Sequence, residues 1–132
     1  KYRNKISGPL LDRIDVQVDV ATLSPHDVAA PSTGEASEKI AARVAHAYRL
    51  QLQRQGCSNQ QLGSRQVDAF CKLAEAGAKL LRDTMLQWHW SARGYHRVLK
   101  VARTIADLAG TERIARGHVA EAIGYRRNLQ ER

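Results

Sequence analysis

The spacing of hydrophobic residues changes once along this 132-residue chain, and that change limits the folds open to it. Residues 14–20, IDVQVDV, alternate apolar and polar side chains, which is the two-residue period of a half-buried strand. From residue 38 onward the apolar residues recur about every 3.6 residues, which is typical of helices. Because a lone strand cannot satisfy its own ladder hydrogen bonds, we expect it either to pair outside this chain or to end a sheet whose other strands are missing.

The segment between the two patterns is predicted to be a linker. Residues 21–37 hold Pro25, Pro31 and Gly34 among small polar residues. Beyond the linker we predict helices over 38–55, 65–75, 78–88, 92–109 and 117–128. Gly77 either separates two of these helices or lies in one bent helix. The sequence therefore predicts a mainly α fold, in which one strand and a linker precede a bundle of four or five helices.

Composition supports helices and suggests the kind of partner. Hydrophobic residues make up 43% of the chain and aromatic residues only 5%, which favours helices over a β-sandwich. The net charge of +8 is compatible with nucleic acid, a phosphorylated ligand or an acidic surface. No apolar run reaches the roughly 18 residues of a membrane span, so we expect a cytoplasmic protein without a membrane partner. Cys57 and Cys71 lack metal-ligand spacing, and we expect no metal site.

The helix predicted after Ser91 carries cations where its dipole disfavours them. Arg93, His96 and Arg97 occupy its opening turns, and its first acid is Asp107. An anion at this helix start would reverse the sign of that effect, because exposed N–H groups and arginines together form a phosphate site. A solvated charged face is the alternative. The polar arc of the helix, roughly 120° wide at 100° per residue, consists of Arg93, His96, Arg97, Lys100, Arg103, Thr104 and Asp107.

The stretch GPLLDRID at 8–15 places an arginine among acids. Gly8 and Pro9 predict a turn, and Arg13 follows it. Arg13 either pairs with Asp12 or Asp15, or is held at the strand edge for a phosphate of another molecule. For the WHW sequence at 88–90, packing at a helix junction is favoured over base stacking. The chain contains no G-x-x-x-x-G-K-[ST] loop and no other phosphate cradle or recognisable catalytic set.

Two stretches carry a family resemblance. KYRNKISGPLLDRIDVQVDV resembles the end of the AAA+ core in magnesium-chelatase-like ATPases of the ComM/YifB competence type, and SARGYHRVLKVARTIADLAG followed by HVAEAIGYR resembles their C-terminal helical lid. The resemblance implies that residues 1–20 end the core with its last strand, that 21–37 form a linker and that 38–132 form the lid. Because such proteins carry their Walker motifs upstream, this chain alone should not hydrolyse ATP.

The resemblance also implies roles for three arginines. Arg13 would be an arginine finger that acts in trans on the γ-phosphate held by a neighbouring subunit. Arg93 would be sensor 2, which contacts the nucleotide from the lid, and Arg97 a weaker nucleotide contact. Family members often carry alanine or an aliphatic residue where Gly94 stands, so the start of this helix is expected to be less rigid.

The implied cofactors are ATP and Mg²⁺ in the longer protein, with none bound by this fragment alone. The implied partners are its own core, the neighbouring subunits of a homo-oligomeric ring, and DNA. The implied activity is that of a branch-migration helicase in recombination or natural transformation. The alternatives are a stand-alone basic helical domain that binds nucleic acid or a partner protein, and the motor subunit of a metal chelatase.

Overall fold

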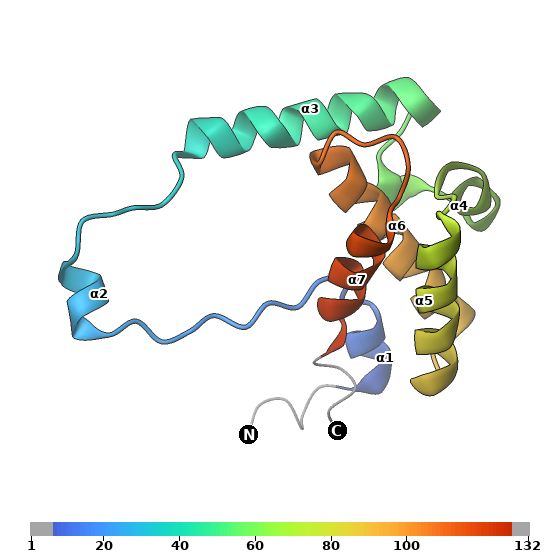
Figure 1. Ribbon diagram of the computed structural model, residues 1–132, viewed down its shortest axis with the longest axis horizontal. Coiled ribbons are helices and arrows are strands. Elements are labelled where there is room, and N and C mark those ends of the chain that lie inside the picture. The colour runs from blue at the N-terminus through green and yellow to red at the C-terminus, as the bar shows by residue number, and fades with distance from the viewer. Residues whose placement is uncertain (1–6, 128–132) are drawn as a thin grey trace.

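Helices account for nearly all regular structure in the computed structural model, which describes residues 7–127 (Figure 1). Seven α-helices and the 3-10 helix η2 lie wholly within this range. In chain order they are α1 (Gly8–Asp12), α2 (Pro25–Ala29), α3 (Ser37–Gln55), η2 (Asn59–Gln61), α4 (Ser64–Phe70), α5 (Glu75–Gln87), α6 (Ala92–Leu108) and α7 (Arg116–Gly124). The predicted mainly α fold is confirmed, and α3 to α7 supply the five helices expected from the change in hydrophobic period.

The core forms around α6. This helix packs against α3, α4, η2 and α7, and α7 also packs against α5. An apolar stripe on α6 drives this arrangement, since burying it removes hydrocarbon surface from water. The fully buried apolar residues of the core are Val67, Leu81, Val98, Ala102, Ala106, Ile114, Val119 and Ala122.

Most helix ends agree with the sequence predictions. Ser91 caps α6, and its Oγ accepts a hydrogen bond from the Gly94 N–H at 3.2 Å. Gly56 and Gly110 follow α3 and α6 with φ values of 76° and 70°, a region that glycine adopts without a Cβ penalty. The prediction of a helix through residue 75 is wrong, because α4 ends at Phe70.

Gly77 does not break a helix; it lies in the first turn of α5. A Cβ placed there would lie 3.1 Å from Cγ2 of Val119 and 3.5 Å from the Cα of Arg116. The glycine therefore allows the close approach of α5 and α7. Sequence spacing alone does not reveal such a contact between helices.

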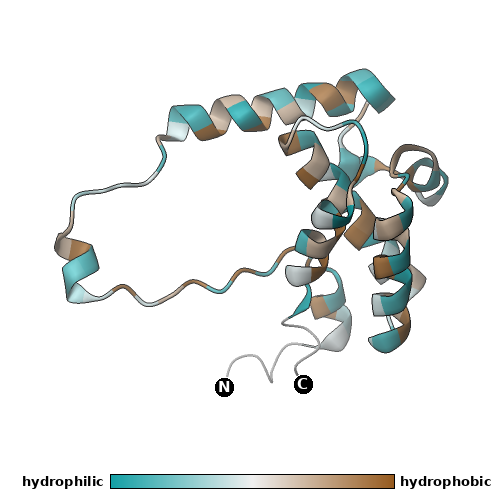
Figure 2. Ribbon diagram, viewed as in Figure 1, coloured by the Kyte–Doolittle hydropathy of each residue, from teal (hydrophilic) through white to brown (hydrophobic). Residues whose placement is uncertain are grey.

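Residues 14–20 have no strand partner within the described residues, and their pairing with a sheet outside this chain stays a prediction. These residues are extended, but no strand ladder forms within the part of the chain that the structure describes. Within this segment the Gln17 N–H donates to the Tyr125 carbonyl oxygen at 3.0 Å, and the Ile14 N–H donates to the Leu11 carbonyl oxygen at 3.1 Å. A strand needs a neighbouring strand, and none lies beside this segment among residues 7–127. Val18 and Val20 remain 66% and 88% exposed, and Figure 2 shows the alternating hydropathy of this segment.

The predicted linker contains a short helix. α2 begins after Ser24, whose side chain accepts from the Asp27 N–H while Asp27 accepts from the Ser24 N–H. All of residues 18–45 are exposed, and this part of the chain arches away from the bundle before α3 returns to it (Figure 1). Likewise, the turn predicted at Gly8 and Pro9 is the first turn of α1, capped by Ser7.

Candidate functional site

A groove of about 1060 Å³ runs along α6. One side consists of the extended segment that follows α1, and the other sides are η2, the start of α4 and the end of α7. Four cationic or titratable side chains of α6 line it: Arg93, His96, Arg97 and Lys100. Apolar residues complete the walls, among them Val16, Val18, Leu62 and Ile105. A groove with apolar walls and several cations suits a phosphorylated ligand that also carries an apolar part.

Arg93 is the most available cation of this groove. It is the second residue of α6, it is exposed, and no carboxylate pairs with it among residues 7–127. The N-cap bond of Ser91 fixes the turn that carries Arg93. The guanidinium of Arg93 therefore lies, without a paired carboxylate among these residues, at the N-terminal end of a helix. Its own charge and the partial positive charge of the helix end both favour an anion there.

Arg97, one turn further along α6, is already engaged. Its Nη1 donates to Oδ1 of Asp15 at 2.6 Å and to the carbonyl oxygen of Arg13 at 2.8 Å. Its side chain is 27% exposed, and its Nε is buried without a hydrogen-bond partner in the described part of the chain. In this structure Arg97 holds the segment that follows α1.

Arg13 is the C-cap residue of α1, and its side chain is exposed. Neither of the salt bridges considered for it forms, because Asp12 pairs with Arg126 and Asp15 pairs with Arg97. Arg13 does not line the groove, whereas Arg93 and Arg97 do. The structure thus places Arg93 and Arg97 in the same groove, whereas Arg13 lies outside it.

Sequence reasoning missed Arg126, which lies just after α7. Its Nη2 donates to Oδ1 of Asp12 at 2.8 Å, and its guanidinium lies over the Trp90 ring, 5.7 Å from the centroid. The residue is only 3% exposed, and its Nε and Nη1 have no hydrogen-bond partner among the residues that the structure describes. An arginine at the end of an apolar helix was the available signal, but its partner Asp12 is 114 residues away in sequence.

The tryptophans around His89 pack at the junction of α5 and α6, as expected. The rings of Trp88 and Trp90 meet edge to face at a centroid distance of 5.5 Å, and Trp90 is 9% exposed. His89 between them has a φ of 52°, which turns the chain between the helices. Trp90 offers no open face for a nucleic-acid base.

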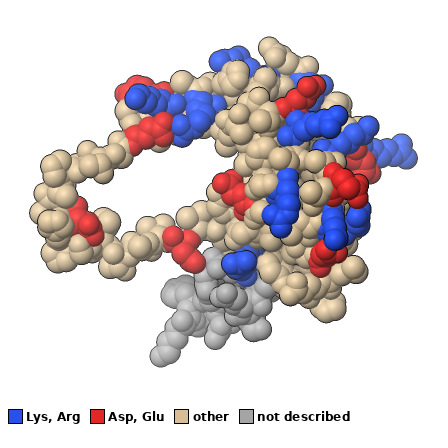
Figure 3. All heavy atoms as spheres, in the orientation of Figure 1, with Lys and Arg blue, Asp and Glu red and all other residues tan. Residues whose placement is uncertain are grey.

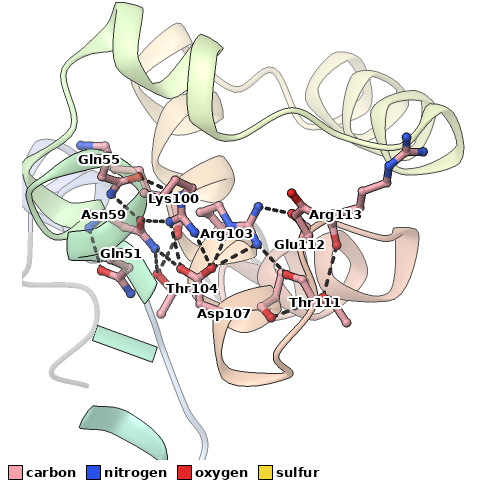
Figure 4. A network of polar contacts seen from close by, with 12 residues as sticks. Gln51, Gln55, Asn59, Lys100, Arg103, Thr104, Asp107, Thr111, Glu112 and Arg113 are labelled. Carbon is pink, nitrogen blue, oxygen red and sulfur yellow. Dashed lines mark hydrogen bonds and ion pairs between the residues drawn. The ribbon is translucent and has the colours of Figure 1, made fainter. Parts of the chain in front are cut away.

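Two residues in the C-terminal half of the polar arc of α6 are buried and not exposed to solvent. Arg103 and Asp107 are 3% and 1% exposed, and they form the i,i+4 ion pair at 3.1 Å. Asp107 also accepts from Arg54. It accepts in addition from Asn59, whose amide nitrogen also donates to Thr104 (Figure 4). The arc therefore divides into a groove-lining half and a buried network.

This network satisfies charges that would otherwise be costly to bury. Burial lowers the pKa of the Arg103 guanidinium, and the carboxylate of Asp107 opposes that shift. The remaining donors of Arg103 reach the carbonyl oxygens of Glu112 and Thr111 at 2.8 and 2.9 Å. The network joins α3 to α6 and to the turn before α7.

The surface charge is mixed, and the thiols are unpaired. On the face shown in Figure 3, Lys and Arg are interspersed with Asp and Glu over the bundle.

No three His, Cys, Asp or Glu side chains between residues 7 and 127 are placed to hold a metal ion. Cys57 and Cys71 are free, and burial raises the pKa of Cys71 to about 11. Over the same residues, no helix has the length and apolarity needed to cross a bilayer.

Comparison with known proteins gives two matching family models. One, described as magnesium chelatase, subunit ChlI C-terminal, matches residues 34–126, and one described as magnesium chelatase, subunit ChlI, matches residues 1–28. The gap between the two matches falls inside the predicted linker.

Two curated relatives match almost all of this chain. Competence protein ComM of Haemophilus influenzae is 39% identical over 127 residues, and the uncharacterized protein YifB of Salmonella typhimurium is 38% identical over 131. Each alignment covers 96% of this chain and 25% of the relative. The chain thus spans about a quarter of the length of the curated relatives it matches.

Proposed function

The chain belongs to the magnesium chelatase subunit ChlI C-terminal family, and on this premise we propose that it is the helical lid of a longer, ring-forming AAA+ ATPase. The match of residues 1–28 to a second model of the same family supports an upstream continuation. So do the relatives, which are about four times longer.

Exposed apolar residues support the same proposal. Val16, Val18 and Val20 alternate along an unpaired extended segment with exposures from 46% to 88%. Ile40, Val44, Tyr48 and Leu52 are spaced by four along α3 and are 39–54% exposed. Apolar surface of this extent is expected where another part of a protein packs.

In this proposal Arg93 acts as sensor 2. ATP and Mg²⁺ are held by the upstream core, and Arg93 reaches the phosphates from the start of α6. The observation that carries this role is the contrast within one region: Arg97 and Arg126 are neutralised by aspartates, whereas Arg93 has no carboxylate partner within residues 7–127. An unpaired guanidinium at a helix start suits a phosphate oxygen.

Arg13 acts as the arginine finger toward a neighbouring subunit. Its side chain is exposed and lies outside the groove, while its carbonyl oxygen is held by Arg97. A guanidinium supplied in trans stabilises charge on the transferring phosphoryl group, an effect of roughly 10³–10⁵ in rate in related nucleotidases.

We propose DNA branch migration in recombination or transformation as the task of the assembled ring, on the strength of the identity to a competence protein. The descriptions of both matching family models favour a second candidate, the motor subunit of a metal chelatase. The rate of ATP hydrolysis, measured with and without single-stranded or branched DNA, distinguishes the two tasks. Branch migration predicts DNA-stimulated hydrolysis that weakens with added salt, and a chelatase motor predicts no stimulation by DNA.

The experiment that tests the ATPase role uses the full-length protein with Arg93→Ala, Arg13→Ala or Arg82→Ala. Arg82 is the matched control, because its side chain is 61% exposed on α5 and pairs with the exposed Glu75 at 3.7 Å. We expect the first two variants to lose at least tenfold in kcat and the control to retain the wild-type rate. Wild-type hydrolysis by both Arg93→Ala and Arg13→Ala would contradict the proposed function.

A further inference from the structure

We infer that Arg97 is a positioning residue for Arg13 and not a nucleotide ligand. The inference rests on the proposed function, because it assigns Arg97 a part in the action of the arginine finger. Its basis is one nitrogen atom: Nη1 of Arg97 donates both to Asp15 and to the backbone carbonyl of Arg13 itself. The lid thus binds the finger by its backbone and leaves the finger's side chain exposed.

Two further contacts fix the chain on either side of Arg13. On its N-terminal side, Asp12 accepts from the buried Arg126 at 2.8 Å. On its C-terminal side, the Gln17 N–H donates to the Tyr125 carbonyl at 3.0 Å. Together with the bonds of Arg97, these anchoring contacts restrain residues 12, 13, 15 and 17. A side chain reaches a neighbouring subunit with defined geometry only when its backbone is restrained in this way.

The surroundings of Arg97 argue against a direct nucleotide contact. The carboxylate of Asp15 lies 2.6 Å from Nη1, and a phosphate at that position would meet a like charge. Arg93, by contrast, has no such neighbour within the described residues.

The position of Arg97 on α6 gives the contact a further consequence. Arg93 and Arg97 are one turn apart on the same helix, so they move together when α6 moves. A shift of α6 caused by nucleotide at Arg93 is therefore carried to the backbone of Arg13. The state of one subunit's site thereby sets the position of the finger offered to the next subunit.

The structural arm of the test measures hydrogen–deuterium exchange in the full-length protein. We expect Arg97→Ala to raise deuterium uptake over residues 13–19 and to leave uptake over α5 unchanged. Arg97→Lys should retain protection, because one ammonium can serve both acceptors, and Arg82→Ala should behave as wild type. Unchanged uptake over 13–19 in Arg97→Ala would overturn the inference.

The kinetic arm separates positioning from binding. Arg97→Ala should lower kcat by roughly ten- to a hundredfold with little change in KM for ATP. The double variant Arg13→Ala/Arg97→Ala should be no slower than Arg13→Ala alone, since Arg97 acts through Arg13. Arg97→Lys should recover most of the rate. A raised KM with unchanged kcat, or additive losses in the double variant, would show that Arg97 contacts the nucleotide and would overturn the inference.

The two proposals fail in different ways. If Arg13→Ala hydrolyses ATP at the wild-type rate, the arginine-finger role of Arg13 fails and the kinetic coupling fails with it, whatever the exchange data show. If Arg13→Ala is slow but Arg97→Ala is as fast as wild type, only the positioning role is refuted.

Discussion

Nη1 of Arg54 lies 2.8 Å from Oδ1 of Asp107 and joins the end of α3 to α6 across 53 residues of sequence. Asp107 is 1% exposed and also pairs with Arg103, so one buried carboxylate neutralises two guanidinium groups. The long helix α3, which is otherwise largely exposed, is fixed to the bundle at this point.

Asp107→Asn should destabilise this chain by about 3–5 kcal/mol, because it leaves buried cations without their counter-charge. Urea denaturation followed by circular dichroism at 222 nm measures the loss. Glu35→Gln is the matched control: it also removes a carboxylate paired with arginine, but the pair of Glu35 and Arg43 is exposed. We expect the midpoint of the control to stay near that of the wild type. An unchanged midpoint for Asp107→Asn would contradict a structural role of the network.

Gly77→Ala should lower the free energy of unfolding by about 1–3 kcal/mol, the usual cost of overpacking. The new methyl group would lie 3.1 Å from Val119, which is fully buried and cannot move aside without disturbing the core. Thermal denaturation measures the change. A stabilised variant would show that α5 and α7 separate at little cost.

Gly94→Ala should have the opposite effect and stabilise the chain by up to about 1 kcal/mol. At this position the nearest atoms to a new Cβ lie at ordinary contact distances of 3.6–3.7 Å. The substitution replaces the poorest non-proline helix former in the first turns of α6. The same denaturation experiment tests it, and a loss of stability would mean that the junction with Trp90 and Arg126 is tighter than these distances imply.

The two cysteines should react at different rates. At pH 8, iodoacetamide should modify the half-buried Cys57 and leave Cys71 unmodified in the folded chain, because burial raises the pKa of Cys71 to about 11 and excludes the reagent. Mass spectrometry of the labelled chain identifies the site. Since the thiolate is the nucleophile, labelling of Cys71 should increase as the pH rises toward 11. In denaturing urea both cysteines should react at pH 8, and rapid native labelling of Cys71 would contradict its burial.

Local signals in the sequence were sufficient for most helix ends. Ser91 and Gly110 bound α6 as predicted, because capping depends on residues within a few positions of the helix end. The strand predicted at 14–20 depends on more than local signals, since a strand forms only beside a partner strand. Its alternating pattern is present, but the pairing that the pattern requires is not formed among the described residues.

The sequence could not divide the polar arc of α6. Arg97 and Arg103 are alike on a helical wheel, yet Arg97 lines a groove and Arg103 is buried. The two arginines differ because each contacts a different residue that is far away in the sequence. Asp15 reaches Arg97 across 82 residues, and α3 brings Arg54 to the carboxylate that Arg103 shares.

The contacts of Asp12 with Arg126 and of Gln17 with Tyr125 also close the polypeptide into a loop. The exposed linker is therefore not the only connection between residues 7–20 and the helices. After a cut within the linker, residues 7–20 would still contact the bundle through these two bonds and through those of Arg97 to Asp15 and to the Arg13 carbonyl oxygen. The contact between residues 7–20 and the bundle therefore does not depend on an unbroken linker.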